Sequence, residues 1–435
     1  MGHRSMPRSP RSMKTVETSV FSKDLCETQR PIGIGRTRVF RGSALVGALF
    51  LLLPGMFMKP RQLDAMPTFA QAYGIKCSVC HTMVPLLNSY GRYVQNTAYA
   101  ALERKVLARA LPIWLDFEPS YDSTAGAGTG EPRYALGNLA FHATGYLAPD
   151  VTYHVQEWVW NSNYGGFVDS FWASYNNILH RNGHLFVGLI ENPQPSPYSQ
   201  TFDIDGPLAS STLVGEHDWG ATYSNRWGTK FAYVTKSLDA EISYVYGNGD
   251  FGGNAGATDY GSVDKTFQYK VAYAHPNVPV EVGVFGSVGT VPVSTGNGID
   301  SYNSQALYIE IDPTTHYRPG LLLIRQDEHD GNPGVSGITG FPLGGTGTYG
   351  TTAEIFESLF NGQVAVSAQH NFNNQGFGQL TNGNAFNVAF NFPHFQYLHG
   401  YVEALTGGES ALSPHPGGPE WKGMLILAIP LRNVR

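Results

Sequence analysis

The chain has 435 residues, of which 51 are Gly, 24 are Tyr and 24 are Phe, and only 14% are charged. Low charge with abundant aromatic residues and Gly is typical of a large antiparallel β structure with tight turns, and not of ordinary soluble enzymes. The formal net charge of -6 argues against a nucleic-acid-binding surface, so we expect no nucleic-acid partner.

The first predicted element is an apolar run from Ser43 to Met58, which follows Arg36, Arg38 and Arg41 and has the length of a signal peptide. A membrane-spanning helix needs about 20 apolar residues, so export is a better interpretation than an uncleaved anchor. We therefore assign residues 1–65 to a signal or targeting segment.

The next feature is Cys77-Ser78-Val79-Cys80-His81, the Cys-x-x-Cys-His spacing at which a haem is attached covalently to an exported chain. Two thiols three positions apart lie on one helical turn and can form thioethers with both vinyl groups of a haem, while the adjacent imidazole reaches the iron. The motif predicts one covalent haem c, attached through Cys77 and Cys80, with His81 as the proximal iron ligand.

Other uses of these five residues fit less well. A structural zinc site needs a second pair of ligands, and the only other cysteine, Cys26, lies in the segment expected to be removed. A thioredoxin-type dithiol needs a βαβ context, which is not visible here, and a redox-active or structural disulfide is the remaining alternative.

Around the motif, residues 66–110 form a short segment that we expect to be α-helical and to contain the haem. Its apolar residues, among them Phe69, Tyr73 and Val79, supply surface that can contact a porphyrin. The segment is too small to build a good core alone. The haem, or a larger body around the segment, must provide the missing buried area.

From Leu111 onward, apolar and polar residues alternate with a period of two, which predicts strands with one apolar and one polar face. Three of these segments show the pattern clearly. The first has Phe267, Tyr269, Val271 and Tyr273 on one face and Gln268, Lys270 and Ala272 on the other, and the second has Val280, Val282 and Val284 opposite Glu281 and Gly283. The third has Ile242 and Tyr244 opposite Glu241 and Ser243.

This alternation also suits a soluble protein of two stacked β-sheets, but three features favour a membrane barrel. Many segments have the roughly 9 to 11 residues that a membrane-crossing strand needs. Tryptophans such as Trp160, Trp172 and Trp227 gather near strand ends, as in an interfacial girdle, and short connections alternate with long Gly- or Pro-rich ones. We predict for residues 111–435 a transmembrane antiparallel β-barrel of about 16 strands, with 14 or 18 also allowed.

A family resemblance rests on Ala65-Met66-Pro67-Thr68-Phe69-Ala70, Tyr73, the Cys77–His81 motif, Pro85, Leu87-Asn88, Tyr90-Gly91 and Tyr99. This stretch resembles the haem segment of the fused outer-membrane monohaem cytochrome-porins, whereas the rest of the chain is similar in architecture only. The resemblance implies that Cys77 and Cys80 hold the haem, that His81 is the proximal ligand, and that the protein lies in the bacterial outer membrane. Its best-known members are ferrous-iron oxidases, but the electron donor of other members is unknown.

The expected function is electron transfer across the outer membrane, from an extracellular donor such as Fe(II) to a periplasmic cytochrome or similar carrier, with the haem segment folded into the lumen as a plug. One alternative is a porin-like channel or structural barrel plugged by a tethered cytochrome with another redox partner. Another is a soluble β protein that carries a cytochrome domain.

The sixth ligand of the haem iron is not fixed by a motif. Met83 follows His81 too closely to reach the opposite face of a haem. His142 and His154 are the candidates, since each is in phase with polar neighbours and is predicted to point into the lumen. The alternative is that both simply line a polar interior.

A second candidate metal-binding set is Asp327-Glu328-His329-Asp330, predicted at the start of a long Gly-rich loop. Its side chains are ligands that suit Fe(II). Asp203 and Asp205, in another long loop, are candidate Fe(II) ligands of the same kind. The alternative for both sets is a solvated loop tip.

Overall fold

The structure is a computed structural model that describes residues 69, 72–75, 79–81, 87–107, 113–122, 133–161, 166–191, 225–246, 265–275, 277–292, 299–311, 320–330, 348–359, 364–374, 380–392, 398–406 and 420–430. The predicted signal segment 1–65, Cys77, Met83, Asp203 and Asp205 lie outside the described residues.

The described part of the chain is mainly β and contains sixteen strands. The first eight are β1 (Ile113–Asp122), β2 (Arg133–Ala148), β3 (Val151–Asn161), β4 (Phe167–Ile178), β5 (Gly183–Ile190), β6 (Arg226–Val234), β7 (Leu238–Tyr246) and β8 (Lys265–Ala274). The others are β9 (Val280–Pro292), β10 (Ile299–Ile311), β11 (Gly320–Asp330), β12 (Thr348–Leu359), β13 (Val364–Asn374), β14 (Leu380–Asn391), β15 (Leu398–Thr406) and β16 (Glu420–Pro430).

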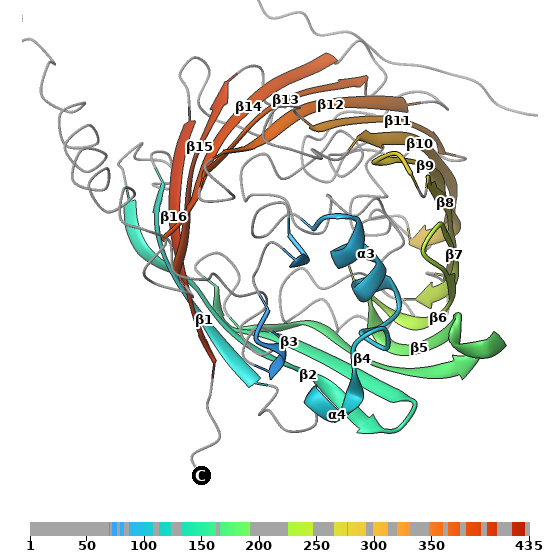
Figure 1. Cartoon of the computed structure of the whole chain (residues 1–435). Coiled ribbons are helices and arrows are strands. Elements are labelled where there is room, and N and C mark those ends of the chain that lie inside the picture. Colours follow the sequence, from blue (N-terminus) through green and yellow to red (C-terminus); the bar gives the residue numbers. More distant parts are fainter. Residues whose placement is uncertain are drawn as a thin grey trace, which may run out of the picture. The chain divides into compact units, whose positions relative to one another are not determined.

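Each strand pairs antiparallel with its neighbours in the sequence, and β1 pairs with β16, which closes the sheet into a barrel (Figure 1). At this junction Trp114 lies opposite Pro430 and Asp122 lies opposite Lys422. Closure leaves no row of unpaired backbone groups at a sheet edge. The mainly antiparallel β fold predicted from the alternating pattern is confirmed.

The two faces of the barrel wall differ sharply in polarity. On the outer face the apolar side chains of Phe267 and Ile242 are 56% and 53% exposed, whereas on the inner face Gln268 and Lys270 are each 2% exposed. A closed sheet that is apolar outside and polar inside suits lipid around it, and is the pattern of outer-membrane barrels. The predicted outer-membrane localisation is therefore confirmed.

One member of the expected tryptophan girdle does not face lipid. Trp160 and Trp227 are about half exposed on the outer side, but Trp172 is 5% exposed and belongs to the inner cluster described below. In β4, Trp172 alternates with the exposed Phe171, so the strand's period of two turns the indole inward. The prediction for Trp172 is therefore wrong, and the reason is its phase along the strand.

From β1 to β8, shorter connections alternate with longer ones, as predicted. Described short connections are the β2–β3 turn at Pro149 and Asp150, the 3₁₀ turn η2 (Leu179–Arg181) between β4 and β5, and the β6–β7 turn at residues 235–237. Because strands are antiparallel, these turns share one end of the barrel. In barrels of this kind the short turns face the periplasm.

Two short helices are described before the barrel, α3 (Ser89–Asn96) and α4 (Arg104–Leu107). Asn88 caps the start of α3, because its side-chain oxygen accepts a hydrogen bond of 3.0 Å from the Gly91 backbone N–H. The helix ends where Ala98 and Tyr99 adopt positive φ angles of 50° and 64°. Among the described residues, no helix has the length and apolar character to cross a membrane.

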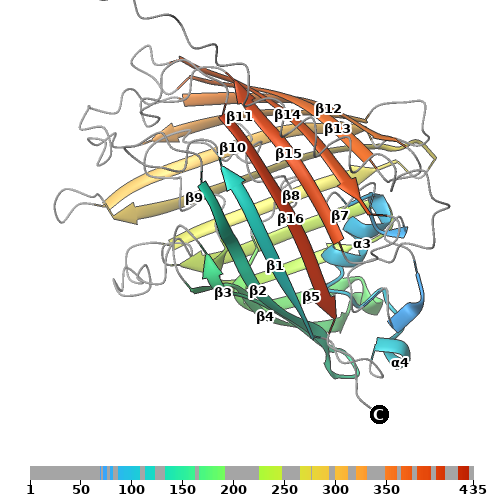
Figure 2. The ribbon, with the colours of Figure 1, turned by 90° about the vertical axis from the view of Figure 1, so that its left-hand side faces the viewer.

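The segment around α3 has no core of its own and shares one with the barrel wall. Its apolar side chains Phe69, Val94, Ala98, Tyr99 and Leu102 form a single buried cluster with Trp172, Phe186, Ile190, Ala232, Val234 and Val245 of the strands β4 to β7. The larger body expected to supply the missing buried area is therefore the inner face of the barrel. Figure 1 shows α3 within the ring of strands, and Figure 2 shows it with α4 toward one end.

Candidate functional site

The turn that carries Cys80 and His81 is fixed to the start of α3 by backbone bonds. His81 forms an isolated antiparallel bridge with Leu87. The Asn88 backbone N–H donates to the Cys80 carbonyl at 2.9 Å, and the Asn88 side-chain amide donates to the Val79 carbonyl at 3.1 Å. One residue therefore caps the helix and holds the motif turn against it.

Gly91 allows this close approach. A Cβ atom at position 91 would lie 2.0 Å from the Cys80 carbonyl oxygen and 2.8 Å from the Leu87 side chain. The nearest of these atoms belongs to the backbone, so it cannot move aside cheaply. The absence of a side chain at Gly91 is thus a requirement for seating the motif turn on α3.

The donor atoms of the motif that the structure describes are a thiol and an imidazole on consecutive residues. Cys80 is a free cysteine with 8% exposure, and burial raises the pKa of its thiol to about 11, while His81 is half-buried. A thiol beside an imidazole in one tight turn would suit one thioether bond and one iron ligand of a haem c.

His142 in β2 points to the inner face, as predicted, but it is engaged with the wall. Its Nε2 atom lies 2.9 Å from Asp116 Oδ2 in β1, a close contact that is not aligned as a hydrogen bond. Its ring stacks on Trp114, with 4.6 Å between ring centroids and an interplanar angle of 6°. This favours the interpretation in which His142 lines a polar interior.

His154 in β3 also faces inward and is 4% exposed. Its Nδ1 atom shares a hydrogen bond of 3.3 Å with the Tyr99 hydroxyl, and its ring stacks on Trp172 with 5.5 Å between centroids. Tyr99 in turn stacks on Trp172 at 5.8 Å. His154 is therefore part of the aromatic contact between the α3 segment and β4.

A third histidine, His399 in β15, was not among the candidates from the sequence. Val402, three residues further along the same strand, pairs with Val388, whose side chain is exposed on the outer face. Because successive side chains of a strand point to opposite faces, His399 lies on the inner face. His399 interacts electrostatically with both His81 and Asp116. The sequence signal was present, because His399, Tyr401 and Glu403 alternate with Leu398, Gly400 and Val402.

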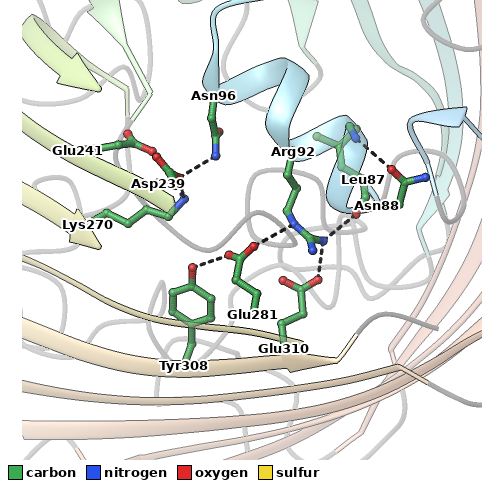
Figure 3. Close-up of polar contacts among 11 residues, drawn as sticks. Leu87, Asn88, Arg92, Asn96, Asp239, Glu241, Lys270, Glu281, Tyr308 and Glu310 are labelled. Atoms are coloured by element: carbon green, nitrogen blue, oxygen red, sulfur yellow. Dashed lines mark hydrogen bonds and ion pairs between the residues drawn. The ribbon is translucent and has the colours of Figure 1, made fainter. Parts of the chain in front are cut away.

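A charged and a polar side chain of α3 attach this helix to the wall on the side of β7 to β10 (Figure 3). Arg92 Nη1 lies 2.8 Å from Glu310 Oε1, and the Asn96 side-chain amide donates to Asp239 Oδ2 at 2.8 Å. Asp239 and Glu281 are the second residues of β7 and β9, next to short connections. The end of the barrel that holds α3 is therefore the end with the short turns.

No group of three or more His, Cys, Asp or Glu side chains in the described ranges is arranged to hold a metal ion. Asp327, Glu328, His329 and Asp330 do not begin a loop as predicted; they are the last residues of β11, where they pair with β10. The strand continues because β10 is long enough to offer partners as far as Tyr302. Backbone pairing thus extends β11 through this polar run.

Comparisons with known proteins identify the fold. No protein-family model and no curated protein sequence matches the chain. Among solved structures, the chain is similar to OmpF of Salmonella typhi in complex with daunomycin, at a TM-score of 0.52 and 14% identity over 73% of this chain and 96% of that chain. It is also similar to the outer membrane channel DcaP of Acinetobacter baumannii, at a TM-score of 0.51 and 9% identity over 73% and 96% of the two chains. The chain therefore has a porin-like barrel fold.

Proposed function

We propose that this chain is an outer-membrane c-type cytochrome that carries electrons across the outer membrane. The observation that carries the proposal is the position of the motif turn: Cys80 and His81 are bonded to α3, and α3 is anchored inside a closed barrel by Arg92 and Asn96. A channel for solutes has no use for a haem-attachment motif in its lumen. When bound, haem c supplies one-electron oxidation and reduction.

The chain's own residues would hold and orient that group. Cys77 and Cys80 would provide the covalent attachment and His81 the proximal ligand. Asn88 and Gly91 set the position of the turn on α3, and the barrel wall separates the lumen from lipid. In this proposal residues 66–110 are the cytochrome segment and residues 111–435 the barrel.

The electron donor would be extracellular, with Fe(II) as the most concrete case, and the acceptor a periplasmic cytochrome or similar carrier. The end of the barrel with short turns faces the periplasm, and α3 contacts the wall at that end. This position favours delivery of electrons to a periplasmic acceptor.

The test is spectroscopic and uses the full-length protein purified in detergent from a host that attaches haem c. We expect a Soret peak and, on mixing with Fe(II) in a stopped-flow instrument, the sharpened bands of a reduced cytochrome. Cys77→Ser with Cys80→Ser is the matched control that keeps the barrel and loses the haem. A wild-type protein without a Soret peak would end the proposal, and a haem that Fe(II) does not reduce would exclude Fe(II) as donor.

A second candidate is a porin-like channel or structural barrel plugged by a tethered cytochrome that serves another redox partner. The similarity to porin-like barrels in fold supports it better than it supports electron transfer. The charged inner wall, with Lys230, Glu241 and Lys270 buried on it, also suits a pore. Intact cells separate the two candidates: an impermeant extracellular reductant should reduce the haem only if the barrel conducts electrons.

A further inference from the structure

The short-turn end of the barrel carries a group of exposed positive charges that we call the basic rim. It consists of Arg104 and Lys105 in α4, Arg181 in η2 and Lys236 in the β6–β7 turn, all of which are exposed. The chain as a whole has a formal net charge of -6. The basic rim is therefore a local departure from the overall charge of the protein.

Two of these cations lie on adjoining turns. The Val234 backbone N–H, at the end of β6, donates to the carbonyl of Asn182, which follows η2, at 2.8 Å. Arg181 directly precedes Asn182, and Lys236 lies two residues after Val234. A backbone hydrogen bond thus fixes the two turns to each other and keeps their cations on one part of the edge.

The α4 helix joins this edge on the lumen side. The Tyr146 hydroxyl, near the end of β2, donates to the Leu102 carbonyl just before α4 at 3.1 Å. The next residue, Leu147, is 66% exposed on the outer face, so Tyr146 points inward. The Tyr146 hydroxyl interacts electrostatically with Arg104 and Arg181. The cations of α4 and η2 therefore lie around one inward-pointing tyrosine at the mouth of the lumen.

Carboxylates balance the basic rim only in part. Asp150 lies 3.8 Å from the Arg181 guanidinium, and Glu103 is exposed next to Arg104. Within the described ranges, the other three cations have no carboxylate at ion-pair distance. Four cations against these two acidic groups leave an excess of positive charge that is open to a partner.

The turn that presents Arg181 is also strained. Leu179, His180 and Arg181 have φ angles of 47°, 59° and 71°, in the left-handed region that residues other than Gly rarely adopt. Strain of this kind persists where the surrounding structure imposes it, and it is concentrated at functional sites. Here it accompanies an Arg181 side chain that is 76% exposed.

We propose that the basic rim is the docking surface for an acidic one-electron carrier of the periplasm. Opposite charges on two proteins guide their encounter and fix their relative orientation. The basic rim lies at the end with short turns, which faces the periplasm and where α3 contacts the wall. The carrier would gain one electron there as the haem iron loses one. The proposal rests on the proposed electron-transfer function and adds the charge and the position of the acceptor's contact.

The experiment is a binding titration of the full-length, haem-loaded protein in detergent with two soluble probes of opposite charge. The probes are plastocyanin, a small acidic electron carrier, and mitochondrial cytochrome c, a small basic one. We expect plastocyanin to bind, with an affinity that falls by about tenfold as NaCl is raised from low to physiological concentration, because salt screens exposed charges. We expect no measurable binding of mitochondrial cytochrome c. Plastocyanin that binds no more tightly than mitochondrial cytochrome c would overturn the proposal.

Lys236→Glu and Lys265→Glu are matched variants, because they change the net charge equally. Lys236 belongs to the basic rim, whereas Lys265 is exposed at the first residue of β8, at the opposite end of the barrel. We expect Lys236→Glu to weaken plastocyanin binding by about fivefold and Lys265→Glu to leave it unchanged. Heat-modifiable migration in gels checks that both variants fold. Equal weakening by the two variants would show that only the overall charge matters, and the proposal would fail.

Anionic lipid headgroups are the other ligand class that exposed cations suit. Plastocyanin should bind equally in nanodiscs of phosphatidylcholine and in nanodiscs that also contain phosphatidylglycerol. Loss of binding with phosphatidylglycerol would assign the basic rim to the membrane and overturn the proposal. The haem-free Cys77→Ser with Cys80→Ser protein should bind plastocyanin as the wild type does, since docking depends on surface charge. Docking can therefore fail while the Soret peak and its response to Fe(II) are intact, and the reverse also holds.

Discussion

The Nη1 atom of Arg92 in α3 lies 2.8 Å from Oε1 of Glu310 in β10, and this pair joins residues 218 positions apart in the sequence. Both side chains are almost fully buried, so neither can turn to bulk water if its partner is lost. Breaking a buried ion pair from one side typically costs about 3 kcal/mol or more. We expect Glu310→Gln to lower the free energy of unfolding by about 3 kcal/mol in urea titrations of detergent-solubilised protein.

The matched control for Glu310→Gln is an exposed pair in the same barrel. Arg181 and Asp150 are 3.8 Å apart, and the Arg181 side chain is 76% exposed. An exposed pair at this distance contributes little, so Arg181→Gln should change stability by no more than about 0.5 kcal/mol. Equal losses for both variants would show that the Arg92–Glu310 pair has no special role.

The sequence predicts the wall better than it predicts what docks on the wall. Alternation with a period of two correctly places Lys270, Glu281 and Glu241 on the polar face, because a strand in a two-sided sheet has only two phases. Nothing in the sequence marks Arg92 as the partner of Glu310, since long-range pairing depends on where α3 docks. The alternation in β15 already marks His399 as inward-facing, but the sequence does not show which inward histidine lies on the side of the barrel that holds His81, because that depends on where α3 docks.

Gly91 is expected to be intolerant of even a methyl group. In Gly91→Ala the new Cβ would lie 2.0 Å from the Cys80 carbonyl oxygen, so α3 and the motif turn must separate. We expect a loss of most of the Soret absorbance per folded barrel. Ser89→Ala, at an exposed position of the same helix, is the control and should keep wild-type absorbance. Normal haem content in Gly91→Ala would contradict the packing of the turn on α3.

The Lys270 ammonium group contacts two carboxylates of β7, Asp239 and Glu241, and its removal should reveal how strongly it is coupled to them. Lys270→Met leaves Asp239 and Glu241 buried with less positive charge, and we expect a loss of about 3 kcal/mol in stability. Adding Asp239→Asn removes one of the stranded charges and should recover part of that loss, which a double-mutant cycle measures. Lys265→Met, at an exposed position of the same strand, should be nearly neutral. Additive losses would indicate that Lys270 and Asp239 act independently.

The three inward histidines should differ in their effect on the haem spectrum. His142 is held beside Asp116 and Trp114, and His154 bonds to Tyr99, whereas His399 interacts electrostatically with His81. Axial ligands set the spectrum and redox potential of a haem iron. We therefore expect His399→Ala to shift the Soret band and the reduction potential of the purified holoprotein, and His142→Ala and His154→Ala to leave both close to wild type.

Added imidazole distinguishes a lost ligand from a general disturbance of the fold. If His399 is the sixth ligand, free imidazole should enter the space left by His399→Ala and return the Soret band to its wild-type position, because it supplies the same donor atom. A shift that imidazole does not reverse would indicate a packing effect of His399 and not ligation. If His142→Ala or His154→Ala shifts the band and His399→Ala does not, the sixth ligand would instead be a histidine of β2 or β3. The contact of that histidine with Asp116 or Tyr99 would then have to break when haem binds.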